Sequence, residues 1–252
     1  MNFIKNKYFS LLLSISPLLI AGQNIKDTSI YAPLFTINYA YQLPEGDLRD
    51  RFGLNHNLGF SSGIKLSSSW IFDIQGSFIF GQNVKDTTII DHLQNSQGWI
   101  INQYGEENRV LIHERGLTLS FQVGKIFDFI GPNPNSGLLI KSGIGIIRHK
   151  IKIENENNLV PQLNPEKLPY YDRLTMGLLL TEFIGYQHMS NNRLTNFYIG
   201  IEASQGLTRG MRDYQIDLMA PLKEKRLDLL FGLRLGWIIP VFRQAPQEFY
   251  IN

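Results

Sequence analysis

The side chains best suited to catalysis in this sequence lie close together near residue 190. The run His188-Met189-Ser190-Asn191 supplies an imidazole and a hydroxyl, and Glu202 follows Ser190 by twelve positions. A nucleophile beside a base, with a carboxylate to orient the base, is the arrangement that enzymes use for acyl transfer. These residues form a candidate hydrolase site, and whether they can meet depends on the elements that carry them.

The four-residue run resembles the His-x-Ser-Asn motif of the outer-membrane lipid A 3-O-deacylases (PagL-like enzymes). In that family the histidine is the base, the serine is the nucleophile and a later glutamate orients the histidine. The resemblance therefore implies these roles for His188, Ser190 and Glu202. It is confined to these residues and a glycine-rich segment upstream.

The elements around these residues are predicted to be β-strands, because apolar residues recur at every second position. In 227–241 the odd positions are apolar, whereas the even positions include Asp228, Gly232, Arg234 and Gly236. A strand sorts these residues onto two faces, as a membrane-spanning β-strand of about nine to eleven residues requires. The same alternation occurs in eight segments, 34–42, 55–66, 70–81, 116–124, 138–151, 174–188, 196–204 and 227–241.

The connections between these segments alternate in length. Those at 67–69, 128–136 and 190–194 are short, whereas those at 82–114, 153–173 and 206–226 are long, and the first, 43–52, is intermediate. Short periplasmic turns and long extracellular loops are typical of outer-membrane barrels. The sequence therefore predicts an all-β fold, an eight-stranded antiparallel up-and-down transmembrane β-barrel.

This topology separates the candidate catalytic residues. His188 and Ser190 would close a periplasmic turn, whereas Glu202 would lie several residues up the next strand, at about 3.3 Å per residue. We therefore expect no catalytic site and no enzyme, with lipid A deacylation as the alternative. The five histidines lack metal-ligand spacing, so we expect no metal and no cofactor.

Strand 174–188 departs from the pattern because Glu182 falls on its lipid-facing side. A charge there costs free energy near the midplane of a bilayer. A β-bulge that shifts the register is therefore predicted in this strand.

Several charged residues are predicted to point into the barrel. An eight-stranded interior has room only for its own side chains, so these charges should pair and form a plug that does not conduct ions. If Thr208 faces Asp228, then Glu202 faces Arg234 directly, and Lys65 and Asp73 are diagonal neighbours. The predicted lumen cluster is Lys65, Asp73, Lys141, Glu202, Asp228 and Arg234.

Two sets of exposed residues are predicted outside the lumen. Aromatic side chains near the strand ends should form interfacial girdles; they are Trp70, Phe129, Tyr186 and Trp237 near the inner ends and Tyr39 and Tyr41 near the outer ends. In loop 82–114, two β-rich runs predict a hairpin that continues the adjoining strands and offers Trp99, Ile101 and Tyr104 to a partner. A basic excess in 206–226 could contact lipopolysaccharide phosphates.

The N-terminus and the composition indicate the cellular location. Residues 1–22 have the basic start, apolar run and small residues of a cleaved secretory signal, which leaves 23–252 as the barrel, with a short periplasmic tail at 243–252. Removing Lys5 and Lys7 leaves a formally neutral chain, so nucleic-acid binding is not expected. We expect a location in the outer membrane of a Gram-negative bacterium.

Across the whole mature chain the pattern of strands and loops resembles the small outer-membrane barrels of the OmpX, OmpW and PorT-like kinds. The resemblance implies an integral outer-membrane protein without catalysis that acts by adhesion, envelope support or docking into a larger machine. We expect a non-enzymatic barrel whose extracellular loops bind a protein or a glycolipid partner, with outer-membrane lipids such as lipopolysaccharide among its partners. PorT-like barrels suggest an accessory role in a secretion or barrel-assembly machine, and OmpW-like barrels suggest passage of small hydrophobic ligands.

Overall fold

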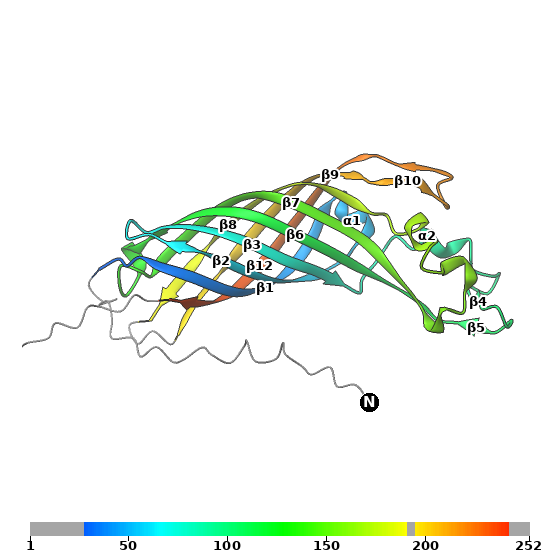
Figure 1. Cartoon of the computed structure of the whole chain (residues 1–252), viewed down its shortest axis with the longest axis horizontal. Coiled ribbons are helices and arrows are strands. Elements are labelled where there is room, and N and C mark those ends of the chain that lie inside the picture. Colours follow the sequence, from blue (N-terminus) through cyan, green and yellow to red (C-terminus); the bar gives the residue numbers. More distant parts are fainter. Residues whose placement is uncertain (1–27, 191–194, 242–252) are drawn as a thin grey trace, which may run out of the picture.

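A closed barrel of eight antiparallel strands forms the body of the protein (Figure 1). The computed structural model describes residues 28–190 and 195–241, so the predicted signal peptide and the tail 243–252 lie outside the described residues. The strands are β1 (Ala32–Gly46), β2 (Asn55–Lys65), β3 (Trp70–Gly81), β6 (Val110–Phe127), β7 (Gly137–Asn155), β8 (Thr175–Met189), β9 (Asn196–Gly210) and β12 (Lys225–Pro240). Each pairs with its neighbours in sequence, and β1 pairs with β12 to close the ring. The predicted fold class is confirmed.

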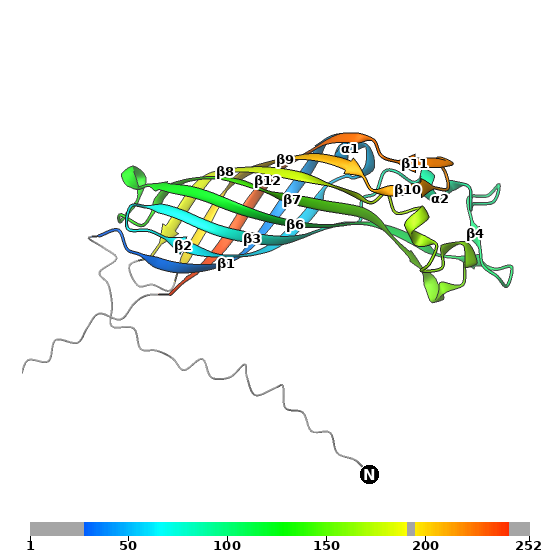
Figure 2. The same cartoon turned by 45° about the horizontal axis from the view of Figure 1, so that its top comes forward.

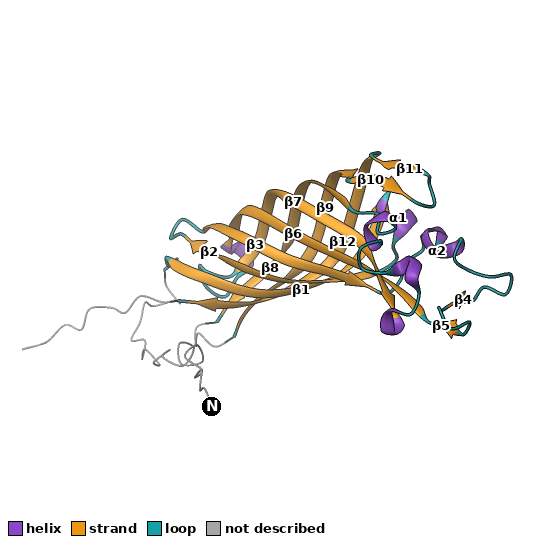
Figure 3. Ribbon diagram, turned by 45° about the vertical axis from the view of Figure 1, so that its right-hand side comes forward, coloured by secondary structure: helices purple, strands orange, loops and turns teal. Residues whose placement is uncertain are grey.

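Short elements occupy the connections. They are α1 (Leu48–Arg51), α2 (Thr88–Asp91), β4 (Ile100–Ile101), β5 (Glu107–Asn108), β10 (Arg212–Gln215), β11 (Ala220–Leu222) and the 3-10 helices η1 (Asp128–Ile130), η2 (Glu156–Asn158), η3 (Pro161–Leu163) and η4 (Leu168–Tyr170). Only η1 lies at the end of the barrel with the short connections, which we call the turn end. All the others lie at the opposite end, the loop end, where Figure 3 shows α1 and α2.

Alternation along each strand produces two different surfaces. In β1, Thr36, Asn38 and Gln42 are buried in the lumen, whereas Ile37 and Tyr41 face outward. Every strand exposes large apolar side chains in the same way, and Ile37, Phe60, Ile74, Leu119, Ile144, Ile184, Ile201 and Leu233 are each about half exposed. An apolar surface that surrounds a closed sheet is suited to contact with lipid.

No helix among the described residues is long and apolar enough to span a membrane.

The strand ends differ from the predicted ones at the loop end. The connections there are 47–54, 82–109, 156–174 and 211–224, whereas the sequence predicted 43–52, 82–114, 153–173 and 206–226. The difference has a physical cause, because strand pairing continues past the apolar wall, where both faces of a strand meet polar surroundings and the alternation fades. Figure 2 shows β6 and β7 extending beyond the other strands at this end, and their ladder continues to the pair Val110 and Asn155.

The predicted bulge in the sixth strand is wrong. β8 keeps an unbroken register with β7 on one side and with β9 on the other. Glu182 therefore keeps the orientation that the alternation gives it, and it is exposed on the outer wall.

Side chains close both ends of the lumen. At the turn end, Leu34, Ile71, Leu139 and Tyr198 belong to a buried apolar cluster. At the loop end a second cluster joins inward-facing strand residues to the loops; it includes Leu48, Phe52, Ile79, Ile89, Ile147, Tyr171, Leu179 and Leu230. Burial of these apolar surfaces stabilises the barrel from within, and the charged residues Asp73, Lys141, Glu202 and Arg234 lie between the two clusters.

Candidate functional site: a filled lumen and a basic outer rim

All six residues predicted to point into the lumen are buried. Lys65, Asp73, Lys141, Glu202, Asp228 and Arg234 are each no more than 6% exposed. Lys141 lies 2.6 Å from Asp73, and Arg234 lies 2.6 Å from Glu202. Charges buried this deeply need such partners, because an unpaired ion in a narrow lumen costs several kcal/mol.

Asp228 and Lys65 have other partners. Asp228 accepts a hydrogen bond from Thr208 at 2.5 Å and contacts the imidazole of His149 at 2.9 Å. Lys65 donates to the hydroxyl of Ser29 and the carbonyl of Ile30. It is a diagonal neighbour of Asp73, which pairs with Lys141 instead.

The predicted register between the last two strands is wrong by two residues. Asp228 faces Gly206, and Arg234 faces Gly200 rather than Glu202. The Arg234–Glu202 ion pair still forms, because diagonal neighbours on one face of a sheet lie within reach of long side chains. Alternation in the sequence assigns each residue to a face of the sheet. It does not fix the register between two strands, because a shift of two residues leaves every side chain on the same face.

Little space remains between these side chains. One cavity of about 10 Å³ lies beside Asp73, Lys141 and Tyr198, and another of about 10 Å³ lies beside Glu202 and Arg234. Each has room for about one water molecule. The described lumen is therefore a packed core.

Purified protein in planar bilayers should show no steady ohmic conductance, because ions have no continuous path through a lumen of this kind. Single-channel recording checks this, with a known porin in parallel to show that insertion works. Long-lived, ohmic openings would contradict the expectation.

The residues that resemble the deacylase motif do not come together. His188 faces outward on β8 and packs against the ring of Phe197, with the ring centroids 5.4 Å apart. Glu202 faces into the lumen and pairs with Arg234. The barrel wall thus separates the imidazole of His188 from the carboxylate of Glu202, and the orienting contact that a triad needs is not formed.

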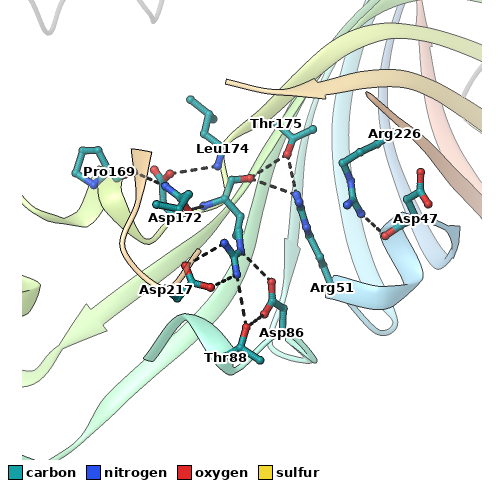
Figure 4. A network of polar contacts seen from close by, with 12 residues as sticks. Asp47, Arg51, Asp86, Thr88, Pro169, Asp172, Leu174, Thr175, Asp217 and Arg226 are labelled. Carbon is teal, nitrogen blue, oxygen red and sulfur yellow. Dashed lines mark hydrogen bonds and ion pairs between the residues drawn. The ribbon is translucent and has the colours of Figure 1, made fainter. Parts of the chain in front are cut away.

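An arginine that was not predicted from the sequence joins the connections at the loop end, and its partners Asp86, Thr88 and Asp217 are labelled in Figure 4. Arg173, just before β8, donates to Asp86 at 3.1 Å, to Asp217 at 2.5 Å and to Thr88 at 3.5 Å. It therefore joins three connections that are far apart in the sequence. No local pattern marks this role, because its partners lie in other loops.

A second arginine fixes the β10–β11 hairpin. Arg212 forms two hydrogen bonds with Asp172, at 2.8 and 2.6 Å. These bonds raise the pKa of Arg212 above its ordinary value, so its charge is fixed at physiological pH. Paired hydrogen bonds of this kind are strong and directional, which indicates that the loops form an ordered cap.

The predicted partner-binding residues lie on a small separate hairpin. β4 and β5 pair with each other, but α2 and an irregular segment separate them from β3, so the hairpin does not continue both adjoining strands as predicted. Trp99, Ile101 and Tyr104 are 49%, 38% and 69% exposed. They therefore offer apolar surface at the loop end.

The predicted interfacial aromatics lie on or near the outer wall. Trp70 and Trp237 are exposed near the turn end, whereas Tyr39 is the central residue of β1 and Tyr41 lies two residues nearer the loop end. The hydroxyl of Tyr39 contacts the imidazole of His56 at 2.6 Å. Phe129 is 73% exposed in η1, and Tyr186 is half-buried near the turn end of β8.

Several basic side chains are grouped on the outer face near the loop end. Cross-strand pairing places one row of outward residues across five adjacent strands, in the order Leu117, Arg148, Met176, Arg209 and Lys225. Arg115 and Lys150 form the next pair toward the loop end. We call Arg115, Arg148, Lys150, Arg209 and Lys225 the basic rim.

Directly below this row is a continuous apolar row. Its members, Leu119, Ile146, Leu178, Leu207 and Leu227, are 40% to 52% exposed. A groove of about 510 Å³ joins the two rows and is lined by Leu119, Ile146 and Met176 with Arg148 at its side. Lys150 lies 3.4 Å from Asp172, whereas Arg148, Arg209 and Lys225 have no acidic partner among the described residues.

Arg209 and Lys225 belong to the basic segment 206–226 identified in the sequence, whereas Arg115, Arg148 and Lys150 were not predicted, although a signal was present. Arg148 stands at an outward position of its alternating strand, just where the apolar outward positions end. Extending the alternation a few residues past the apolar segment identifies it.

A closed antiparallel barrel with a filled lumen, an apolar outer wall and charged residues above that wall defines the class of small membrane-spanning β-barrel proteins. No protein-family model matches the sequence, and no curated protein is significantly similar to it.

Several solved structures are similar in overall architecture. Ail, the attachment invasion locus protein of Yersinia pestis, in complex with the heparin analogue sucrose octasulfate, is 9% identical with a TM-score of 0.45, over 82% of this chain and 98% of Ail. The N-terminal β-barrel domain of Pseudomonas aeruginosa OprF is 11% identical with a TM-score of 0.36, over 81% and 96%. The outer membrane protein OprG from Pseudomonas aeruginosa is 10% identical with a TM-score of 0.35, over 88% and 100%. These similarities agree with the expected resemblance in architecture, and the fold assignment rests on the strand pairing of this chain.

Proposed function

We propose that this chain is a non-enzymatic outer-membrane barrel that binds an anionic glycolipid of the lipopolysaccharide type at its basic rim. The turn end would then face the periplasm and the loop end the exterior. The observation that carries the proposal is the row that contains Arg148, Arg209 and Lys225, which lies directly above an apolar row on the same adjacent strands. Lipid A has the same order, with phosphates above acyl chains.

The chemistry of the groove supports this ligand. Arginine forms directional hydrogen bonds with phosphate, and Arg148 stands beside a groove lined by Leu119, Ile146 and Met176. An acyl chain in this groove would carry its phosphate to the level of Arg148 and Arg209. Because neither arginine has an acidic partner among the described residues, both are available to an anion.

Replacing Arg148 and Arg209 together by glutamine should weaken binding of lipid A about 10- to 30-fold, since each basic residue near a charged lipid surface contributes roughly 1 kcal/mol. Binding of purified protein in nanodiscs to lipid A is the measurement. The matched control is R49Q with K85Q, which removes the same charge from the connections that follow β1 and β3. Equal binding of lipid A and its dephosphorylated form would contradict the proposal.

A protein partner at the β4–β5 hairpin is a second candidate, as part of an outer-membrane secretion or assembly machine. It is favoured by the exposure of Trp99, Ile101 and Tyr104, because aromatic side chains often anchor protein interfaces. Co-purification from native membranes in mild detergent tests it. A partner that is lost with W99A and Y104A, but not with the turn-end variant F129A, would support it.

The two remaining alternatives need features that the described residues do not show. Passage of small hydrophobic ligands needs a lateral opening, whereas all eight strand ladders are continuous. Deacylation needs His188 beside Glu202, and the barrel wall separates them. Release of a fatty acid from lipid A by the purified protein, abolished by Ser190→Ala, would overturn the non-enzymatic proposal.

A further inference from the structure

The outer wall of the barrel carries one carboxylate at mid-height. Glu182 is the central residue of the 15-residue strand β8, between the lipid-facing residues Leu180 and Ile184. The register of β8 is continuous on both sides, so no bulge turns this side chain inward. The carboxylate therefore lies in the middle of the apolar wall.

The described part of the chain offers Glu182 no compensating partner. It forms no ion pair among the described residues, and the nearby cation Lys141 points into the lumen, where it pairs with Asp73. Either end of β8 is about 23 Å away along the strand, which is too far for the side chain to reach polar surroundings. A charged group in this position is costly in lipid, and such residues commonly mark functional sites.

The wall is indented around Glu182. The outward residues opposite it are small, Ser142 on β7 and Ala203 on β9. Together with Ile140, Ile184 and Ile201 they line a shallow groove of about 470 Å³. Small residues let a second membrane segment approach closely, and we call this groove the β8 notch.

A second polar side chain lies beside the notch. Gln205 faces outward on β9, opposite Leu180, and is exposed. It makes no side-chain hydrogen bond among the described residues. Glu182 and Gln205 therefore give adjacent strands an acceptor and an amide on a surface that is otherwise apolar.

We propose that the β8 notch docks a membrane-spanning segment of a partner protein that presents a lysine or arginine to Glu182. Charge complementarity selects this partner over the alternatives. A second copy related by twofold symmetry would bring two Glu182 carboxylates together. Lipid phosphates are anionic and lie at headgroup level, above the notch. The site is separate from the basic rim and does not depend on glycolipid binding.

The absence of cysteine from the sequence makes a site-specific cross-linking test possible. In native outer membranes, the new cysteine of the Ser142→Cys variant would be labelled with a photoactivatable maleimide cross-linker. After illumination, mass spectrometry would map the adduct. Ser62→Cys is the matched control, since Ser62 faces outward on β2, which lies diametrically opposite β8 in the ring. We expect a protein adduct at Ser142 and none at Ser62. The adduct should map to a membrane-spanning segment with a lysine or arginine at the same depth.

Substitution of Glu182 separates docking from mere proximity. Glu182→Leu should lower the adduct yield about tenfold or more, because a buried cation on the partner would lose its counterion, and Glu182→Gln should have a smaller effect. Both variants should fold, since they remove a lipid-facing charge, and heat-modifiable migration in gels checks this. An unchanged yield with Glu182→Leu, an adduct with a second copy or with lipid alone, or no protein adduct would each overturn the proposal.

Discussion

Replacing Arg234 by methionine should lower the free energy of unfolding by about 3–5 kcal/mol, one of the largest single-residue effects expected in this barrel. Arg234 is 3% exposed, and it donates to both Glu202 and Asn38. Without the guanidinium, the carboxylate of Glu202 keeps, among the residues that the structure describes, only the amide of Gln42 as a partner, at 3.3 Å. Urea unfolding of the protein in lipid vesicles, followed by tryptophan fluorescence, measures the loss.

The double variant R234M/E202L is the control for this prediction. Because both charges are gone, no buried ion is left unpaired, and most of the lost stability should return. The difference between the double variant and the sum of R234M and E202L gives the coupling between the side chains. A coupling near zero would show that the ion pair does not stabilise the filled lumen.

Replacing Phe52 by alanine should cost about 3–5 kcal/mol, the usual range for removing a buried aromatic side chain. Phe52 is fully buried in the loop-end cluster, and its ring meets the imidazole of His149 edge-on, with the ring centroids 5.9 Å apart. The loss should appear first at the loop end, because the cluster joins α1 to the strands. Unfolding in vesicles and proteolysis of the loops are the two measurements.

Phe129→Ala provides the matched control, since the same atoms are removed from a ring that is 73% exposed at the turn end. Its stability should stay within about 0.5 kcal/mol of the unchanged protein. Equal losses for the two variants would mean that Phe52 contributes no more than a surface ring, and the loop-end cluster would not be a core.

The barrel was predictable from the sequence because its signal is repeated in every strand. Alternation identified eight segments and assigned Lys141, Glu202 and Arg234 to the interior. Two apolar residues on the inward face of β7, Leu139 and Ile147, are fully buried because they belong to the apolar clusters at the two ends of the lumen.

The cap and the exact pairings were not predictable from the same signal. Leu48 and Ile89 reach the loop-end core from the four-residue helices α1 and α2, and Phe52 from the position after α1, and segments this short show no hydrophobic period. The register was wrong by two because neighbouring same-face positions satisfy the pattern equally well. Glu182 led to the false bulge, since the prediction assumed that a charge would avoid lipid, whereas the structure keeps it outside.

The seam between β1 and β12 has a consequence for how the protein is made. Its pairs run from Leu34 with Pro240 to Gly46 with Asp228, so they join residues roughly 200 positions apart, and such long-range pairing forms slowly. Until the last strand has been synthesised and exported, β1 has an unpaired edge that lipid cannot satisfy. The growing chain therefore cannot enter the membrane one strand at a time. It needs either a protected edge during insertion or near-simultaneous closure of the whole ring.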